Sequence, residues 1–539
     1  MSITSFSFVF FVIVSLVFYY IIPKKFQWCI LLAASIVFYA MSGWTNVIYI
    51  LLASAVAYLS AVWMQKKTDY QKAYLSEHKS ELSKEEKREF KAKIKSIRKR
   101  IMILSVLFFT VILVALKILS PSSFLSGVFI DSVNIIVPLG ISYYTLQTIG
   151  YIVDVYWNIT NAETNYLKLL LFTSFFPQMT QGPINDYRYL SSQFYTEHHL
   201  SYDDFTKGFE RAMWGYFKKI VIADTMALYI NDLFANYSSY SSPTLLIGVA
   251  SCMIRLYVDF SGYMDIVCGI CKMFGIDLTE NFNRPFSSRS LSEFWTKWHI
   301  SLGAWFKKYV FFPVAVSGWN KRISDRISKH LGEQIADKYM SSMALFSVWL
   351  LIGFWHGASA AYIIWGLING IIMIASDWLD PVYSNLKAKC RINDKSKIWK
   401  AIQVARTFVI VSFLEVLTDV GGLHNGVIYI CRSVSFIKPK SVYDLLPYYD
   451  IDHLTSIKAF ILAIVEYMDD AHNAIICVFS LICVLAVSIL GRNRRFGERF
   501  SKLPLFVRVV IMSAMFVVVV IFGAEASVNN VGGFLYAEF

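Results

Sequence analysis

One histidine of this sequence stands inside an apolar run, in the stretch WLLIGFWHGASAAYIIWG at positions 349–366. A neutral imidazole carries one hydrogen-bond donor and one acceptor, and a buried imidazole needs partners for both. Ionisable groups at membrane depth are costly and usually face a cavity, and the small residues Gly353 and Gly357 leave room for a ligand near His356. An imidazole at neutral pH can act as a general base. From this stretch alone, a structural hydrogen bond between helices explains His356 equally well.

A second histidine, His299, lies in FWTKWHISLGAWF, between tryptophans and lysines. This pattern is typical of an amphipathic helix at a membrane interface, so a place in an aromatic belt is the alternative to a functional role. The other seven histidines lie in polar or loop contexts. The sequence has no GxSxG nucleophile motif, no Walker lysine loop and no HExxH metal motif.

Other residues suggest different chemistry. Carboxylates in apolar stretches can mark a proton or ion path, and Asp154, Asp259 and Asp265 fit that description. They support an ion-coupled transporter as an alternative of another class. Cys268 and Cys271 form a CxxC pair, but no second pair or histidine cluster follows at zinc spacing. We therefore read them as small apolar residues and predict no metal site.

These residues must be held by membrane helices. The chain of 539 residues is 56% hydrophobic and only 17% charged, whereas soluble domains are about 25% charged. Apolar runs of 18 residues or more recur along it, and each is long enough to span a bilayer. The sequence predicts an all-α, polytopic integral membrane protein with about 11 to 13 membrane segments, forming one domain over residues 1–539.

The apolar runs place membrane spans at 6–22, 26–41, 47–64, 101–119, 135–156, 166–180, 243–270, 342–356, 360–377, 401–420, 474–490 and 504–523. The stretch 280–315 is different, because aromatic and basic residues alternate with apolar ones. This favours re-entrant or interfacial helices over a lipid-facing span.

The formal net charge of +13 is best explained by topology, since basic residues accumulate in cytoplasmic loops. The basic segments 65–100 and 378–400 are predicted to be cytoplasmic, and the more acidic 421–473 extracytoplasmic. Both termini are then extracytoplasmic. Nucleic-acid binding is not expected from a charge distributed in this way.

Longer motifs carry a resemblance to a known family. Residues 257–313, with ENFNRPF followed by SEFWTKWHISLGAWF, resemble the signature of membrane-bound O-acyltransferases (MBOAT). FFPQMTQGPINDY at 175–187, GFWHGASAAYIIWG at 353–366 and VPLGISYYTLQTIGYIVDVY at 137–156 resemble further family elements in the same order. The likeness is strongest to the bacterial branch that O-acetylates alginate and other polysaccharides. It covers most of 130–370, the predicted catalytic core.

The resemblance implies a role for particular residues. His356 would be the catalytic histidine and His299 the second functional one, inside a central tunnel. Four more residues would shape that tunnel: Asn283, Arg284, Trp295 and Trp298. One element departs from the family pattern. Relatives often carry an aromatic–aromatic–Arg–Ala motif after the span near 401–416, whereas this chain reads FLEVLTDVGGLHNG.

The C-terminal tail, 525–539, ends in FLYAEF. It resembles the short aromatic motif of the same bacterial branch. Tyr536 would then receive the acyl group near His356 and pass it to a secreted partner. The alternative is a hydrophobic tail that only packs on the surface.

The resemblance implies transfer of an acyl group, most simply acetyl, from a cytoplasmic thioester to an envelope or secreted polysaccharide. The donor would be acetyl-CoA or an acyl carrier thioester, with no bound cofactor. The partner would be an extracytoplasmic SGNH-type esterase-like protein, and the location a bacterial cytoplasmic membrane. D-alanyl transfer to teichoic acid and peptidoglycan O-acetylation are close alternatives, and a non-catalytic envelope scaffold is a more distant one.

Overall fold

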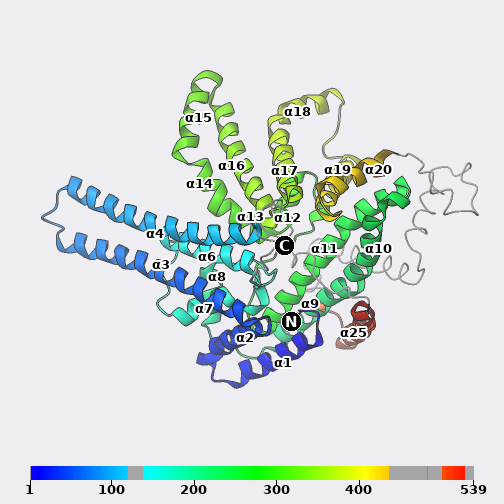
Figure 1. Ribbon diagram of the computed structural model, residues 1–539, viewed down its shortest axis with the longest axis horizontal. Helices are drawn as coiled ribbons and strands as arrows, with labels where there is room; N and C mark the ends of the chain where they lie inside the picture. Colours follow the sequence, from blue (N-terminus) through cyan, green and yellow to red (C-terminus); the bar gives the residue numbers. More distant parts are fainter. Residues whose placement is uncertain (1, 119–137, 436–481, 483–499, 529–539) are drawn as a thin grey trace, which may run out of the picture. The chain divides into compact units, whose positions relative to one another are not determined.

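A computed structural model describes residues 2–118, 138–435, 482 and 500–528 (Figure 1). Their regular structure is helical, and the only extended pairing among them is one antiparallel bridge between Phe282 and Trp298. The prediction of an all-α fold is confirmed. Contacts divide the chain into two compact units, Met1–Thr206 with Ile270–Thr279, and Lys207–Gly269 with Glu280–Phe539. Each is described by itself below, and the predicted core at 130–370 stays a prediction.

The described residues include eight helices that are long and apolar enough to cross a membrane. They are Lys24–Met41, Trp44–Glu77, Lys84–Ile118, Ser242–Met273, Glu333–His356, Ala360–Trp378, Lys397–Asp419 and Leu505–Gly523. A shorter apolar helix, α1 (Phe6–Ile21), precedes them. The predicted span at 474–490 lies outside the described residues. The chain is a multi-pass membrane protein.

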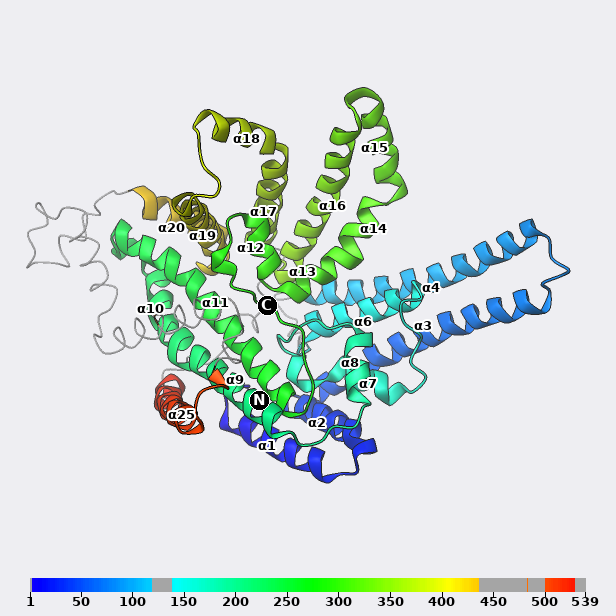
Figure 2. The ribbon, with the colours of Figure 1, turned by 180° about the vertical axis from the view of Figure 1, so that it is seen from behind.

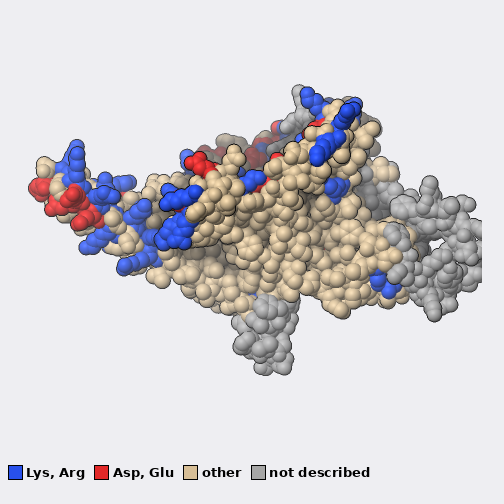
Figure 3. All heavy atoms as spheres, turned by 90° about the horizontal axis from the view of Figure 1, so that it is seen from above, with Lys and Arg blue, Asp and Glu red and all other residues tan. Residues whose placement is uncertain are grey.

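The first unit is built on a long antiparallel hairpin of α3 (Trp44–Glu77) and α4 (Lys84–Ile118) (Figures 1 and 2). A capping box starts α4: the Ser83 hydroxyl accepts the Glu86 N–H, and the Ser83 N–H donates to the Glu86 carboxylate. The predicted basic loop at 65–100 is therefore a helical hairpin. Its outer end carries clustered basic and acidic side chains, whereas uncharged residues cover the part nearer its base (Figure 3).

Helix α6 (Ile141–Tyr156) packs against α3 and α4 and is buried at fifteen of its sixteen positions. Arg98 on α4 binds its C-terminal end: the guanidinium donates to the carbonyls of Val155 at 3.0 Å and Tyr156 at 2.8 Å. A cation there satisfies carbonyls that have no partner within the helix. The segment predicted as a span at 135–156 is thus a helix enclosed by protein.

The span predicted at 166–180 is wrong. Helix α7 (Tyr166–Ser174) has nine residues and is followed by a 3₁₀ turn, Phe176–Gln178. Pro177 lacks an N–H and disfavours helical backbone in the residue before it, and the Phe176 N–H bonds instead to the Ser35 hydroxyl at 3.1 Å. Helices α2 (Gln27–Met41) and α8 (Tyr187–Phe194) also belong to this unit.

In the second unit, α9 (Tyr202–Tyr216), a π-helix (Phe217–Ala223) and α10 (Asp224–Ala235) follow one another without a break. They run beside α11 (Ser242–Met273). Glycines permit this close contact, because a Cβ on Gly215 would lie 2.6 Å from the carbonyl oxygen of Gly262. Helix α25 (Leu505–Val528) packs on the π-helix, and its Arg508 pairs with Glu210.

The stretch 280–315 contains α12 (Leu291–Lys297) and then, without a break, α13 (Ile300–Phe306), a π-helix (Lys307–Phe311) and α14 (Phe312–Ala315). This continuous segment is not among the helices that are long and apolar enough to cross a membrane, in agreement with the sequence. The rest of the unit comprises α15 (Gly318–Leu331), α16 (Glu333–His356), α17 (Ala360–Trp378), α18 (Asp380–Lys389), α19 (Lys397–Asp419) and α20 (Leu423–Ser435).

Helices α16 and α17 form a tight hairpin (Figure 1). Gly353 faces Gly366, and a Cβ on Gly366 would lie 2.6 Å from the carbonyl oxygen of Trp349. Small residues let two membrane helices approach closely. This contact fixes the end of α16 against the start of α17, where the candidate site lies.

Candidate active site

His356 is the last residue of α16. The helix stops because the next residue, Gly357, has extended backbone. The imidazole is 6% exposed and is surrounded by aromatic rings. Its centroid lies 5.0 Å from the ring of Trp355, 5.3 Å from that of Trp365 and 6.2 Å from that of Tyr362. The apolar run thus places a buried histidine at a helix end.

A pocket opens beside this imidazole, and we call it the His356 pocket. Four helices, α11, α16, α17 and α19, supply its lining: Leu256, His356, Tyr362, Trp365, Glu415, Thr418 and Asp419. Sequence reasoning missed Glu415 and Asp419. The signal was present, because they are acids within the apolar run 401–420, the same criterion that singled out Asp154. The pocket combines aromatic walls with a potential base and two carboxyl groups.

His299 stands at the N-cap of α13 with left-handed backbone, φ 47° and ψ 52°. Such a conformation costs a non-glycine residue about 1–3 kcal/mol. Asn281 holds the backbone after it, since its carbonyl accepts the Ile300 N–H at 3.1 Å and its side chain accepts the Ser301 N–H at 2.9 Å. Burial lowers the pKa of His299 to about 3, so the imidazole is neutral at physiological pH.

The two histidines meet at one tryptophan. The ring of Trp355 lies 6.2 Å from the His299 ring and 5.0 Å from the His356 ring, centroid to centroid. His299 also packs edge-on against Phe260 at 4.8 Å. Two histidines that are 57 positions apart in the chain are therefore neighbours of the same side chain.

The predicted tunnel residues divide into two pairs. Trp295 donates from its indole N–H to Asn369 at 3.1 Å and packs 5.6 Å from Trp365, a neighbour of His356. Trp298 is 3% exposed within an aromatic cluster that includes Phe282. The other pair is less enclosed.

Asn283 is exposed, and its backbone N–H bonds to the Lys297 carbonyl at 3.0 Å. Arg284 is half-buried, with left-handed backbone at φ 49°. The buried amide in this loop is that of Asn281, which sequence reasoning missed. It is 1% exposed and also donates to the Met264 sulfur at 3.1 Å. A tunnel role for Asn283 and Arg284 stays a prediction.

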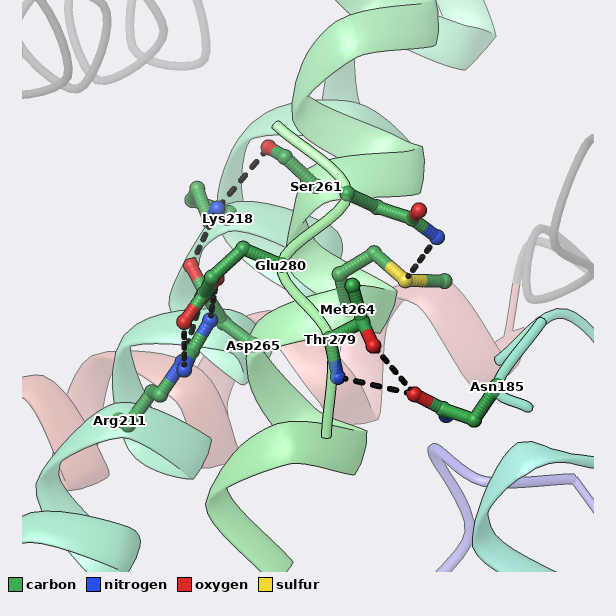
Figure 4. A network of polar contacts seen from close by, with 9 residues as sticks. Asn185, Arg211, Lys218, Ser261, Met264, Asp265, Thr279 and Glu280 are labelled. Atoms are coloured by element: carbon green, nitrogen blue, oxygen red, sulfur yellow. Dashed lines mark hydrogen bonds and ion pairs between the residues drawn. The ribbon is translucent and has the colours of Figure 1, made fainter. Parts of the chain in front are cut away.

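A partly buried ion network anchors the loop that carries Asn281 (Figure 4). Arg211 of α9 binds Glu280 through two parallel hydrogen bonds, at 2.8 and 2.7 Å, and Asp265 of α11 at 2.9 Å. Lys218 adds bonds to Asp265 at 2.7 Å and to Ser261 at 2.9 Å. Because Glu280 directly precedes Asn281, the network fixes the start of the segment leading to His299.

The next residue, Lys219, makes a second set of ion pairs. The Lys219 ammonium is 2.8 Å from Asp224 and 2.7 Å from Asp259, and all three side chains are almost wholly buried. Burial raises the pKa of Asp224 to about 7, against the opposing effect of Lys219. Near neutral pH Asp224 is therefore partly protonated, which reduces the negative charge beside Lys219.

Lys218 and Lys219 both lie on the π-helix and pair with acids of α11. The wider turn of a π-helix changes the angle between successive side chains, and such segments often occur at functional sites. Asp259 and Asp265, two of the three acids of the predicted ion path, are paired with Lys219 and Lys218. The third, Asp154, lies on α6 in the first unit.

Cys268 and Cys271 are buried on α11. Over the residues that the structure describes, no group of three or more His, Cys, Asp or Glu side chains could hold a metal ion. Tyr536 lies outside the described residues, so its place relative to His356 stays a prediction.

Comparison with known proteins identifies the class. The model of the membrane-bound O-acyltransferase family matches residues 161–414. The chain is 34% identical over 291 residues to the probable alginate O-acetylase AlgI of Pseudomonas syringae pv. tomato, covering 54% of this chain and 50% of that protein. It is 32% identical over 269 residues to the peptidoglycan O-acetyltransferase of Helicobacter pylori, covering 45% and 48%.

A third relative is matched over more of its length. The chain is 30% identical over 293 residues to the teichoic acid D-alanyltransferase of Streptococcus thermophilus, covering 51% of this chain and 67% of that protein. The chain therefore belongs to the membrane-bound O-acyltransferase family. It spans about half the length of the alginate O-acetylase that it matches. The resemblance inferred from the motifs is confirmed.

Proposed function

We propose that this protein is a membrane O-acyltransferase that passes an acetyl group from a cytoplasmic thioester to an envelope or secreted polysaccharide. The observation that carries the proposal is the buried His356 in a pocket at the end of a helix long enough to span the membrane. The similarity to alginate O-acetylases supports acetyl as the acyl group and a polysaccharide as the acceptor. Acetyl-CoA or an acyl carrier thioester would be the donor, and no bound cofactor is required.

In this reaction His356 acts as the general base. Its neutral imidazole takes the proton of the acceptor hydroxyl, and the oxygen attacks the thioester carbonyl carbon. The carbon–sulfur bond then breaks, and the leaving thiolate takes up the proton. The rings of Trp355, Trp365 and Tyr362 around the imidazole limit water, which protects the thioester from hydrolysis.

His299 would serve the same centre, because both histidines contact Trp355. Its neutral imidazole can donate or accept a hydrogen bond but does not carry charge at physiological pH. We propose that it orients the reacting groups, with Trp295 and Trp298 forming walls of the central tunnel. Asn283 and Arg284 would line the same passage.

The proposed location is a bacterial cytoplasmic membrane, with both termini outside. An extracytoplasmic SGNH-type esterase-like protein would complete delivery to the glycan. Tyr536 would receive the acetyl group as an ester before that step. Tyr536→Phe, which removes only the acceptor oxygen, is then expected to abolish glycan acetylation. Full acetylation by this variant, at normal protein amounts, would eliminate the relay.

The identity of the acyl group can be tested in the host. We expect that deleting the gene lowers the acetate released by mild alkali from envelope and secreted polysaccharides, and that restoring the wild-type gene returns it. The measurement is mass spectrometry of the released acids. Loss of D-alanine in place of acetate would favour the second candidate, D-alanyl transfer, which the similarity to the Streptococcus enzyme supports. Loss of acetate from peptidoglycan alone would favour peptidoglycan O-acetylation.

A further inference from the structure

His299 lies in a sharp turn between two short helices. Helix α12 ends directly before Trp298, whose backbone is extended (φ −110°, ψ 130°), and α13 begins at Ile300. The left-handed backbone of His299 between them persists in a non-glycine residue only where the surroundings hold it. The place of the imidazole, against the rings of Phe260 and Trp355, therefore depends on whatever fixes this turn.

Two consecutive residues of another loop hold the turn on both sides of the histidine. Before His299, Phe282 pairs with Trp298 in the antiparallel bridge. After His299, the Asn281 carbonyl accepts the Ile300 N–H at 3.1 Å. The backbone on either side of the histidine is thus bound to one short segment, and this segment can keep His299 in its left-handed conformation.

The side chain of Asn281 also caps the helix that follows the turn. The first N–H groups of a helix have no partner within it, and the side chain of the residue before the helix often accepts one of them. In α13 that residue is His299, and its imidazole does not cap the helix. The Asn281 side-chain oxygen accepts the Ser301 N–H at 2.9 Å instead. The cap of α13 therefore comes from a distant residue.

Asn281 is itself held by the helix that contacts the histidine. It is 1% exposed, and its amide donates to the Met264 sulfur of α11 at 3.1 Å. Phe260, which packs against the His299 ring, lies one helical turn before Met264 and so on the same face of α11. One face of α11 thus contacts both the histidine and the asparagine that binds its turn.

We propose that Asn281 is a positioning residue for His299: its bonds to the first turn of α13 keep the left-handed backbone that places the imidazole beside Trp355. The inference rests on the proposed function, in which His299 orients the reacting groups near the base His356. Asn281 acts through His299 and takes no part in the bonds that form or break. A displacement of about 1 Å in a group that orients reactants can cost about 100-fold in rate.

The test replaces the side-chain oxygen of Asn281. Asn281→Leu and the smaller Asn281→Ala remove the acceptor of the Ser301 N–H, whereas Asn281→Asp keeps an acceptor, since aspartate and asparagine cap helices about equally well. The matched control is Asn320→Leu. Asn320 is also a buried asparagine of the second unit, on α15, and its amide donates to the carbonyls of Val314 and Met340.

Initial rates are measured with acetyl-CoA, an oligosaccharide from the host's acetylated polysaccharide and the SGNH-type partner, and unfolding of each solubilised variant is measured in parallel. We expect Asn281→Leu and Asn281→Ala to lower kcat about 10- to 100-fold with little change in KM. Asn281→Asp should recover most of the rate. Asn320→Leu should lose stability to a comparable extent and keep the wild-type kcat.

A double mutant separates positioning from a general loss of structure. If Asn281 acts through His299, adding Asn281→Leu to His299→Ala should lower kcat by no more than about twofold, because the imidazole is already absent. A combined loss equal to the product of the two single losses would overturn the proposal. Asn281→Leu at the wild-type kcat, or Asn320→Leu with an equal loss, would do the same. A wild-type protein that transfers no acetyl would instead defeat the proposed function.

Discussion

Replacing His356 with alanine is expected to lower the rate of acetyl transfer by about 10²- to 10⁴-fold, the usual contribution of a positioned general base. The variant should reach the membrane in wild-type amounts. The helix already ends at His356 because of the backbone of Gly357, so the side chain is not needed to terminate it. The measurement is the initial rate of transfer from labelled acetyl-CoA to the acceptor oligosaccharide in the presence of the SGNH-type partner, with purified protein of verified monodispersity.

His330→Ala is the matched control, because His330 is an exposed histidine on α15. Its rate is expected to equal that of wild type. If His356→Ala also transfers acetyl at the wild-type rate, His356 is structural and another residue acts as the base. An absence of transfer by both proteins would favour a transporter or a non-catalytic scaffold.

Lys219→Met is expected to produce the largest loss of stability among single substitutions in the second unit. The ammonium is 2% exposed and within 2.8 Å of two buried carboxyl groups, those of Asp224 and Asp259. Removing one partner of a buried ion pair costs about 3–5 kcal/mol, because the remaining charge has no compensation. Methionine keeps the length and apolar character of the lysine side chain, so the loss of stability reports on the removed positive charge. The measurement is unfolding of the detergent-solubilised protein.

Two further variants make this prediction specific. Lys321→Met, at an exposed position of α15, should unfold like wild type. Adding Asp224→Asn and Asp259→Asn to Lys219→Met removes the uncompensated charges and should recover much of the lost stability. A Lys219→Met protein as stable as Lys321→Met would show that the buried pairs do not contribute as the geometry implies.

The sequence predicted the histidines better than it predicted their surroundings. His356 was recognisable because a polar ring in an apolar run with small neighbours has few explanations. Its proximity to His299 depends on the start of α13 and the end of α16 meeting at Trp355, a contact between distant positions. The family resemblance already implied that the two histidines share one tunnel. The structure shows that both rings lie near Trp355.

Several features were not predictable from local pattern. Lys218 and Lys219 are buried, whereas lysines are almost never fully buried unless they are paired. A π-helix has no distinctive periodicity in the sequence, and its ion pairs reach acids on another helix. The span predicted at 166–180 failed because Pro177 breaks an otherwise apolar run. Asn281 gave no signal, since its role is to bind backbone twenty residues ahead.

The most direct test of the account is the side of the membrane on which acetyl arrives. Purified protein is reconstituted in sealed vesicles, with labelled acetyl-CoA outside and the acceptor oligosaccharide enclosed. The host's SGNH-type partner is included in the lumen, and the analysis is restricted to molecules whose cytoplasmic face is outward. We predict label on the enclosed glycan with wild-type protein and about 100-fold less with His356→Ala. Equal labelling by both proteins would contradict the account, as would the absence of labelled glycan with wild-type protein.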